Sequence, residues 1–275
     1  MQIPTACGIP MSYFSQAQFC VRLEWGSAAI RNLARDVDCV IIIDVMSFST
    51  CVSMAVDRGA VVYPYPWRDE TSLQYGAARG AEVASAKHRF AKGWSLSPQS
   101  MLNAVHGLQL VLPSPNGSAC SYDARDLGKA VYSASFRNLR ATATACRRYD
   151  RILVVPCGER WPDDNGLRPS FEDYLAAGGI VSALDRHDVS PEARAAAMVY
   201  DGWEPHRIAD ISACSSAIEL RERGFEADIA LCLEEDVSGV ACRLEAFTQL
   251  KMGCGERFIH LARHSASTLQ SWGDR

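Results

Sequence analysis

Four short apolar segments of this 275-residue chain each run directly into a polar turn, and these turns hold the side chains best suited to chemistry. The segments span residues 40–44, 108–112, 130–133 and 152–156. Carboxylates, hydroxyls, an Asn-Gly pair and arginines follow within a few residues. Carboxylate oxygens suit a hard divalent cation, while hydroxyls, helix-start amides and guanidinium groups suit an anion. This set predicts a metal-assisted reaction on an anionic substrate.

Asp44 ends an otherwise uncharged apolar segment. A buried carboxylate is costly unless it is paired, hydrogen-bonded or bound to a metal. A helix cap or turn acid would be the purely structural explanation. The functional explanation is favoured because Ser47, Ser49 and Thr50 follow at once, and their hydroxyls can join helix-start amides in holding an anion. We therefore predict that Asp44 is a metal ligand or a catalytic carboxylate.

The second turn reads Ser-Pro-Asn-Gly-Ser over residues 114–118. A structural turn explains it well, because Asn-Gly accepts positive φ and Ser118 can cap the next helix. The same amides can instead hold phosphate oxygens at the end of a parallel strand. The third turn places Ser135, Arg137 and Asn138 at a helix start, where Arg137 is either an exposed residue or a donor for phosphate or sulfonate.

The fourth turn contains Gly158, Glu159 and Arg160, and two further acids, Glu172 and Asp173, open a later predicted helix. Acids in the first turn of a helix commonly do no more than complement the helix dipole. Together with the carboxylate of the first turn, however, they supply the oxygen ligands that Mg²⁺ prefers. The sequence therefore predicts a magnesium site near these turns.

The elements that carry the turns alternate along the chain. Apolar runs without interruption are typical of parallel strands buried on both faces. Further strands are expected at residues 19–24 and 61–65, and helices at 27–35, 49–58, 69–79, 118–127 and 137–148. The pattern predicts an α/β fold, a three-layer α/β/α arrangement with a mixed, largely parallel sheet. Ligands bind outside the carboxyl ends of the strands in such sheets, so the four turns should converge on one site.

In the second half of the chain we expect helices at 171–184, 191–200 and 212–224, then strands at 228–233 and 240–244. The last 30 residues are expected to include an edge element, and residues 1–17 to be loosely ordered. Because the chain has no internal repeat and no low-complexity linker, residues 1–275 are predicted to form a single domain.

Composition narrows the functional class. Hydrophobic residues make up 48% and charged residues 22%, which is ordinary for a globular protein. The net charge is -4 and the chain has no basic block, so its charge pattern does not indicate nucleic-acid binding. No apolar run approaches the roughly 18 residues of a membrane span. We expect no secretion signal and hence a cytoplasmic protein. The eleven cysteines are expected to be buried reduced thiols. A homodimer is left open.

Taken in order, the turns resemble the motifs of the 2-phosphosulfolactate phosphatase family. The family's first motif runs roughly D-V-[LF]-R-A-[ST]-[ST], and this chain has Asp-Val-Met-Ser-Phe-Ser-Thr from Asp44. The remaining motifs match Ser-Pro-Asn-Gly-Ser from Ser114, the Ser135 and Asn138 helix start, Pro-Cys-Gly-Glu from Pro156, and Glu-Asp-Tyr-Leu-Ala-Ala-Gly from Glu172. The resemblance covers about residues 35–245.

This resemblance implies an α/β/α fold, a requirement for Mg²⁺ and hydrolysis of the phosphate monoester of sulfolactate, a reaction of coenzyme M synthesis. The chain departs from the family pattern at Ser47, where the motif has an arginine. An anionic substrate still needs a cationic partner. We therefore predict that Arg137 supplies the guanidinium from a neighbouring strand end, with Arg160 as the other candidate.

The predicted site has three groups of residues. The catalytic group is Asp44, Asn116 and Glu159, with Glu159 orienting or deprotonating water. The metal ligands are Asp44, Glu172 and Asp173, directly or through water. The residues expected to hold the small anionic phosphoester are Ser47, Ser49, Thr50, Ser114, Gly117, Ser118, Ser135, Arg137, Asn138, Gly158 and Arg160.

Two alternatives remain at this level. The end of the strand at Asp44 is also similar to isochorismatase-like hydrolases, which need a catalytic Cys and Lys, and Cys157 and Lys129 could be nominated for those roles. The other alternative is a degenerate paralogue that binds an anion without turnover, and Ser47 is its main support.

Overall fold

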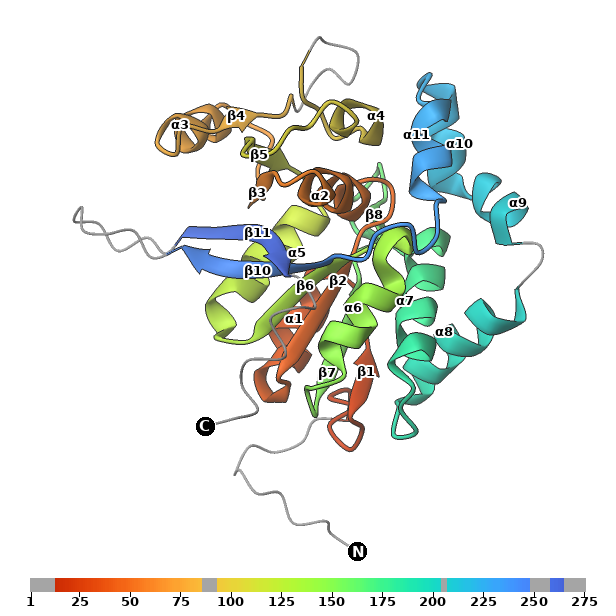
Figure 1. The fold of residues 1–275 in the computed structure, drawn as a ribbon. Coiled ribbons are helices and arrows are strands. Elements are labelled where there is room, and N and C mark those ends of the chain that lie inside the picture. Colours follow the sequence, from red (N-terminus) through yellow and green to blue (C-terminus); the bar gives the residue numbers. More distant parts are fainter. Residues whose placement is uncertain (1–12, 86–92, 204–206, 248–257, 265–275) are drawn as a thin grey trace, which may run out of the picture.

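A nine-stranded mixed sheet lies at the centre of the computed structural model, which describes residues 13–85, 93–203, 207–247 and 258–264 (Figure 1). Four parallel strands form one half, two antiparallel strands follow, and three strands parallel to one another complete it. In sheet order the strands are β1 (Val21–Leu23), β7 (Ile152–Pro156), β2 (Cys39–Ile43), β6 (Ala130–Ala134), β10 (Ala241–Phe247), β11 (Phe258–His264), β3 (Val61–Tyr65), β5 (Gln109–Pro113) and β4 (Glu82–Val83).

Alternate residues of the central strands face two separate hydrophobic cores. Val40 and Ile42 of β2 lie in one core, and Ile41 and Ile43 lie in the other. The first core is covered by α1 (Gly26–Leu33), α2 (Phe48–Asp57) and α5 (Gly117–Ala124). The second is covered by α6 (Leu139–Cys146), α7 (Phe171–Leu184) and α8 (Pro191–Gly202). A sheet covered on both faces explains the uninterrupted apolar runs, and the predicted α/β fold is confirmed.

The register of the parallel strands β2, β6 and β7 places their last residues beside one another, so the three polar turns that follow them start at the same height along the sheet. Ile43, the last residue of β2, pairs with Ala134 of β6 on one side and with Pro156 of β7 on the other. The turns that follow these strands therefore begin side by side at the carboxyl edge of the sheet. The sheet thus positions Asp44 beside the turn that leads to Glu159.

Two elements differ from the sequence prediction. Residues 228–233, expected as a strand, belong mostly to the helix α11 (Glu226–Cys232), whose Ile229 and Cys232 are buried at helical spacing. The last 30 residues, expected at a sheet edge, contain the end of β10 and all of β11, which lie inside the sheet between β6 and β3. The prediction for residues 1–17 lies mostly outside the described residues, and the single domain stays a prediction.

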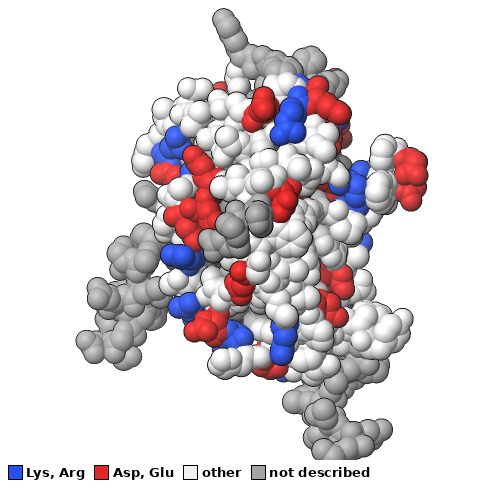
Figure 2. All heavy atoms as spheres, turned by 90° about the vertical axis from the view of Figure 1, so that its right-hand side faces the viewer, with Lys and Arg blue, Asp and Glu red and all other residues white. Residues whose placement is uncertain are grey.

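The remaining helices are α3 (Thr71–Ala77), α4 (Pro98–Met101), α9 (Arg207–Ser212) and α10 (Ser215–Glu222). A two-stranded ribbon, β8 (Glu159–Arg160) and β9 (Leu167–Arg168), follows β7. In the described part of the chain no helix is long and apolar enough to cross a membrane. On the face shown in Figure 2, basic side chains are scattered among acidic ones. Nine cysteines lie in the described ranges, and all nine are free thiols.

Candidate active site

Asp44 is held in place by hydrogen bonds from two strand-end turns. Its Oδ2 accepts from the backbone N–H of Gly117 at 2.7 Å and from the Ser114 hydroxyl at 3.4 Å. Its Oδ1 accepts from the backbone N–H of Phe48 at 3.2 Å. The side chain is buried. The turn after β2 and the turn after β5 therefore meet at this carboxylate, as the sequence predicted.

Glycine is required at position 117 because the main chain there approaches the Asp44 carboxylate closely, and not because of its backbone conformation. A Cβ at position 117 would lie 2.2 Å from the Phe48 ring and 2.8 Å from the Asp44 Oδ2. Gly117 is not among the glycines with positive φ, so the expected reason for the Asn-Gly pair is wrong. The missing side chain is what lets the main chain reach the carboxylate.

Asp173 joins two neighbouring turns through its carboxylate. Its Oδ1 accepts from the backbone N–H of Val45 at 2.7 Å, and its Oδ2 accepts from the backbone N–H of Gly158 at 2.9 Å. Burial, followed by the charges of Glu172 and Asp44, raises the pKa of Asp173 well above its ordinary value. Asp173 thus fixes the ends of β2 and β7 relative to one another.

Glu159 lies across from Asp44 and is oriented by Asn116, whose Nδ2 donates to the Glu159 Oε2 at 2.8 Å. Burial, followed by the negative charge of Asp44, raises the pKa of Glu159 to about 8. Burial and the charge of Glu172 also raise the pKa of Asp44, against the hydrogen bonds from the main chain. Four carboxylates of like charge are therefore gathered at this edge of the sheet.

A cavity of about 310 Å³ opens over this cluster. Six predicted residues line it: Asp44, Ser47, Ser114, Asn116, Glu159 and Arg160. Sequence reasoning missed a second group of charged and polar lining residues: Arg68, Ser216, Glu219 and Arg223. Three of these belong to α10 or the residue that ends it, far from the motifs in the chain, and no spacing rule links them to the strand ends.

Three hydroxyls that were expected to hold the substrate are used by the protein itself. The Thr50 hydroxyl donates to the Val45 carbonyl at 2.8 Å, and the Ser118 hydroxyl donates to the Leu112 carbonyl at 2.8 Å. The Ser49 hydroxyl accepts from the Asp44 N–H and from the Ser133 hydroxyl. All three lie outside the cavity lining, and their hydrogen bonds brace the turns.

The third turn is also structural. Ser135 and Asn138 form a capping box at the start of the helix, and the Asn138 amide donates to the Val240 carbonyl at 3.1 Å. Arg137 is buried and forms ion pairs with Asp57, at 3.8 Å, and with Glu234. These residues do not line the cavity. The prediction that Arg137 supplies the missing guanidinium is therefore wrong, because its charge is already neutralised elsewhere.

The predicted ligand set of Asp44, Glu172 and Asp173 is not assembled. Within the described ranges, no three His, Cys, Asp or Glu side chains are grouped so that they could hold a metal ion together. Both Asp173 oxygens accept main-chain N–H groups, and Glu172 accepts from the Cys214 thiol at 3.3 Å. Mg²⁺ commonly takes only one or two carboxylates plus water and phosphate. Asp44, which lines the cavity, fits that smaller requirement.

Comparison with known proteins gives a consistent match. Residues 29–246 match the family model described as 2-phosphosulpholactate phosphatase. Proteins named "Probable 2-phosphosulfolactate phosphatase" from Thermotoga petrophila and Thermotoga maritima are each 29% identical over 208 residues, which is 73% of this chain and 87% of each relative. A protein of the same name from Thermus thermophilus is 26% identical over 211 residues, 72% of this chain and 84% of its own length.

Proposed function

The chain belongs to the 2-phosphosulfolactate phosphatase family, and on this premise we propose that it hydrolyses 2-phosphosulfolactate or a related phosphorylated acid with the help of Mg²⁺. The observation that carries the proposal is the position of Asp44, which main-chain donors hold in the lining of a small cavity that Glu159 also lines. A cytoplasmic location belongs to the same proposal, as does a place in coenzyme M synthesis, which the family resemblance implies.

In the proposed reaction a water oxygen attacks phosphorus, the bond from phosphorus to the substrate's alcohol oxygen breaks, and the alcohol oxygen takes up a proton. Glu159 is suited to moving that proton, because a group with a pKa near 8 can both hold and accept a proton close to neutral pH. The Asn116 amide holds the Glu159 carboxylate toward the cavity. Ser47 and Ser114 also line the cavity.

Asp44 would hold the magnesium ion. A bound cation would offset the negative charge of the phosphoryl group and the mutual repulsion of the carboxylates. Glu172 and Asp173 support this role indirectly, because Asp173 fixes the two turns that carry Asp44 and Glu159, and Glu172 lies beside it in the sequence. The predicted role of these two residues as direct ligands is not retained.

Phosphate release from 2-phosphosulfolactate tests the proposal most simply. We expect release by the wild-type protein with Mg²⁺, loss of release with excess chelator, and recovery when Mg²⁺ is restored. Full activity in chelator would refute the metal role. Absence of phosphate release under all conditions, with tight binding of the phosphoester, would instead favour the degenerate paralogue.

The isochorismatase-like alternative is not favoured. Cys157 is buried, and burial and Cys120 raise its pKa well above the ordinary value, which opposes thiolate formation. Lys129 comes directly before β6, at the amino end of the strand, whereas Cys157 and Asp44 lie at the carboxyl ends of neighbouring strands. The required Asp, Lys and Cys are therefore not brought together.

A further inference from the structure

Helix α10 closes one side of the cavity whose floor carries Asp44 and Glu159. Ser216, Glu219 and Leu220 of α10 line the cavity, as does Arg223 directly after it. In Figure 1, α9, α10 and α11 form a group at the upper right, and buried residues of all three belong to the second hydrophobic core. The Cys214 thiol, at the start of α10, donates to Glu172 at 3.3 Å and ties this group to the carboxylate cluster.

Ser216 has a hydroxyl with no partner. Its side chain is only 4% exposed, it lines the cavity, and its Oγ has no hydrogen bond. A buried hydroxyl without a partner costs free energy, and most buried polar groups in proteins are satisfied. The Oγ itself is buried, so a rotation of the Ser216 side chain would bring the hydroxyl to a ligand atom in the cavity and give it the partner it lacks.

Arg223 provides a cation on the same side. Its guanidinium pairs with Glu219 one helical turn earlier, at 2.9 Å, and both side chains are substantially exposed. Exposed pairs of this kind contribute little to stability, so exchanging Glu219 for a ligand anion costs little. Guanidinium groups bind carboxylate, sulfonate and phosphate oxygens through two parallel hydrogen bonds. Arg137 is engaged elsewhere. Arg223 is thus suited to bind the anion that has no arginine partner at position 47, and Arg68 and Arg160 are further guanidinium groups in the lining.

We propose that Ser216 and Arg223 bind the sulfonate of 2-phosphosulfolactate, while the phosphoryl group lies at Asp44 and Glu159. This inference rests on the proposed function and makes it more specific. The preferred substrates are small phosphomonoesters that carry an acidic group on the carbon next to the phosphorylated one. A cavity of about 310 Å³ suits a molecule of this size.

Two substrates that differ only in this group test the inference. 2-Phosphosulfolactate and 2-phospholactate share the phosphate and the carboxylate, but 2-phospholactate has a methyl group in place of the sulfonate-bearing carbon. For Ser216→Ala and for Arg223→Ala we expect kcat/KM for 2-phosphosulfolactate to fall by about 10-fold or more, mostly through KM. For 2-phospholactate it should change less than twofold.

The same helix offers matched controls. Ser215 is exposed, and Arg221 donates to the Ser212 carbonyl and lies outside the cavity lining. Ser215→Ala and Arg221→Ala should keep the preference for 2-phosphosulfolactate. If Ser216→Ala and Arg223→Ala lower kcat/KM equally for both substrates, or for neither, the inference is wrong.

Binding of the product separates this inference from the proposed function. Calorimetry with sulfolactate, and with lactate as the control, requires no turnover. We expect the wild-type protein to bind sulfolactate more tightly than lactate, and Ser216→Ala to lose about 10-fold in affinity for sulfolactate alone. Failure of the wild-type protein to prefer sulfolactate would overturn the role of α10, whether or not phosphate is released. Hydrolysis without this preference would leave the proposed function standing.

Discussion

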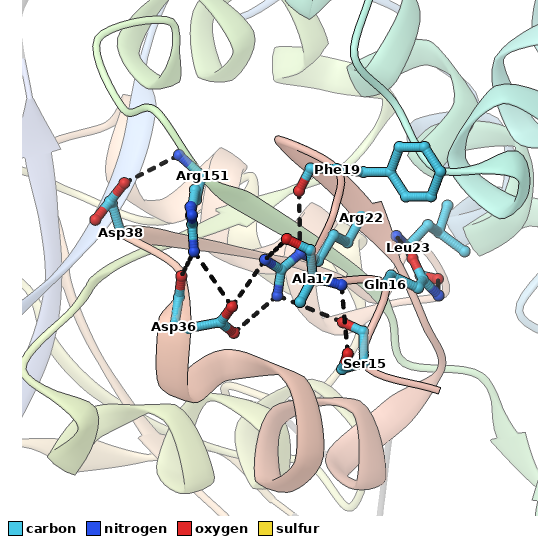
Figure 3. Close-up of polar contacts among 9 residues, drawn as sticks. All are labelled: Ser15, Gln16, Ala17, Phe19, Arg22, Leu23, Asp36, Asp38 and Arg151. Atoms are coloured by element: carbon cyan, nitrogen blue, oxygen red, sulfur yellow. Dashed lines mark hydrogen bonds and ion pairs between the residues drawn. The ribbon is translucent and has the colours of Figure 1, made fainter. Parts of the chain in front are cut away.

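The amino and carboxyl ends of the parallel strands both bury charge, but in opposite ways. Near the amino ends, the fully buried Arg22 of β1 faces Asp36, and its Nη1 and Nη2 donate to the two carboxylate oxygens at 2.8 and 2.9 Å (Figure 3). The other N–H groups of the guanidinium donate to the carbonyls of Ser15, Ala17 and Phe19. Every donor of this buried cation thus has an acceptor.

At the carboxyl ends, charges of one sign are gathered instead. Asp44, Glu159 and Asp173 have raised pKa values, in each case chiefly because of burial and then because of neighbouring carboxylates. Main-chain N–H groups and one amide orient these carboxylates without neutralising them. Buried charge therefore has a different role at each end of the strands. At the amino ends opposite charges pair and stabilise the fold, whereas at the carboxyl ends like charges are positioned to bind a cation and to take part in the reaction.

The largest expected effect comes from changing Asp44 to Asn. An amide has no negative charge for a cation and presents only one acceptor to the donors around it. We expect phosphate release to fall by about 10³-fold or more. The exposed Asp123, which pairs with Arg31 on the surface, offers a control, and Asp123→Asn should keep full activity. Near-normal turnover by Asp44→Asn would remove this residue from the chemistry.

The opposite end of the strands should respond in stability and not in catalysis. Asp36→Ala leaves the buried guanidinium of Arg22 without its carboxylate, and losing one partner of such a pair costs about 3 kcal/mol of unfolding free energy. Denaturant unfolding measures the loss, and kcat/KM at a temperature where the variant is folded should stay within twofold of wild type. The double change Arg22→Met with Asp36→Ala should recover much of the stability. A large loss of activity in the folded Asp36→Ala variant would show that the Arg22–Asp36 pair also affects the site at the carboxyl ends of the strands, and would contradict this prediction.

Much of this arrangement could be predicted from the sequence, because strand, turn and helix alternate with clear hydrophobic periods. The convergence of Asp44 and Glu159 follows from the parallel pairing of β2 with β7. The approach of Asn116 does not, because three antiparallel pairings make β5 run opposite to β2. The run at 228–233 was mistaken for a strand because short apolar runs do not distinguish strand from helix.

Long-range packing accounts for the other errors. The ion pairs of Arg137 depend on Asp57 and Glu234, which lie 80 and 97 positions away in the chain, and its position at a helix start gives no sign of them. The approach of Ser216 to the cavity likewise depends on how α10 packs over the strand ends. Local patterns carry no information about such contacts.

The two ends should also respond oppositely to pH in the metal-free protein. The native pKa of Glu159 is raised from 4.5 to about 8, so between these values the native state binds more protons than the unfolded state. Its contribution to stability is present below pH 4.5 and is lost as pH rises through about 8. At Asp36, burial would raise the pKa, but the hydrogen bonds and charge of Arg22 outweigh it and lower the pKa. That contribution is lost instead as pH falls below the ordinary value of 3.8.

The unfolding free energy of metal-free Glu159→Gln at pH 8, measured together with its turnover, tests the contrast most directly. Glutamine keeps an oxygen for the Asn116 amide and removes one of the gathered charges. We expect the variant to be more stable than wild type by about 1 kcal/mol or more, to lose the decline in stability between about pH 4.5 and 8, and to release phosphate about 10²–10⁴-fold more slowly. Glu226→Gln, which changes an exposed acid that pairs with Arg221 outside the cavity lining, should change neither property much. A Glu159→Gln protein that is less stable than wild type at pH 8 and fully active would contradict the view that like charges are held at this end for catalysis.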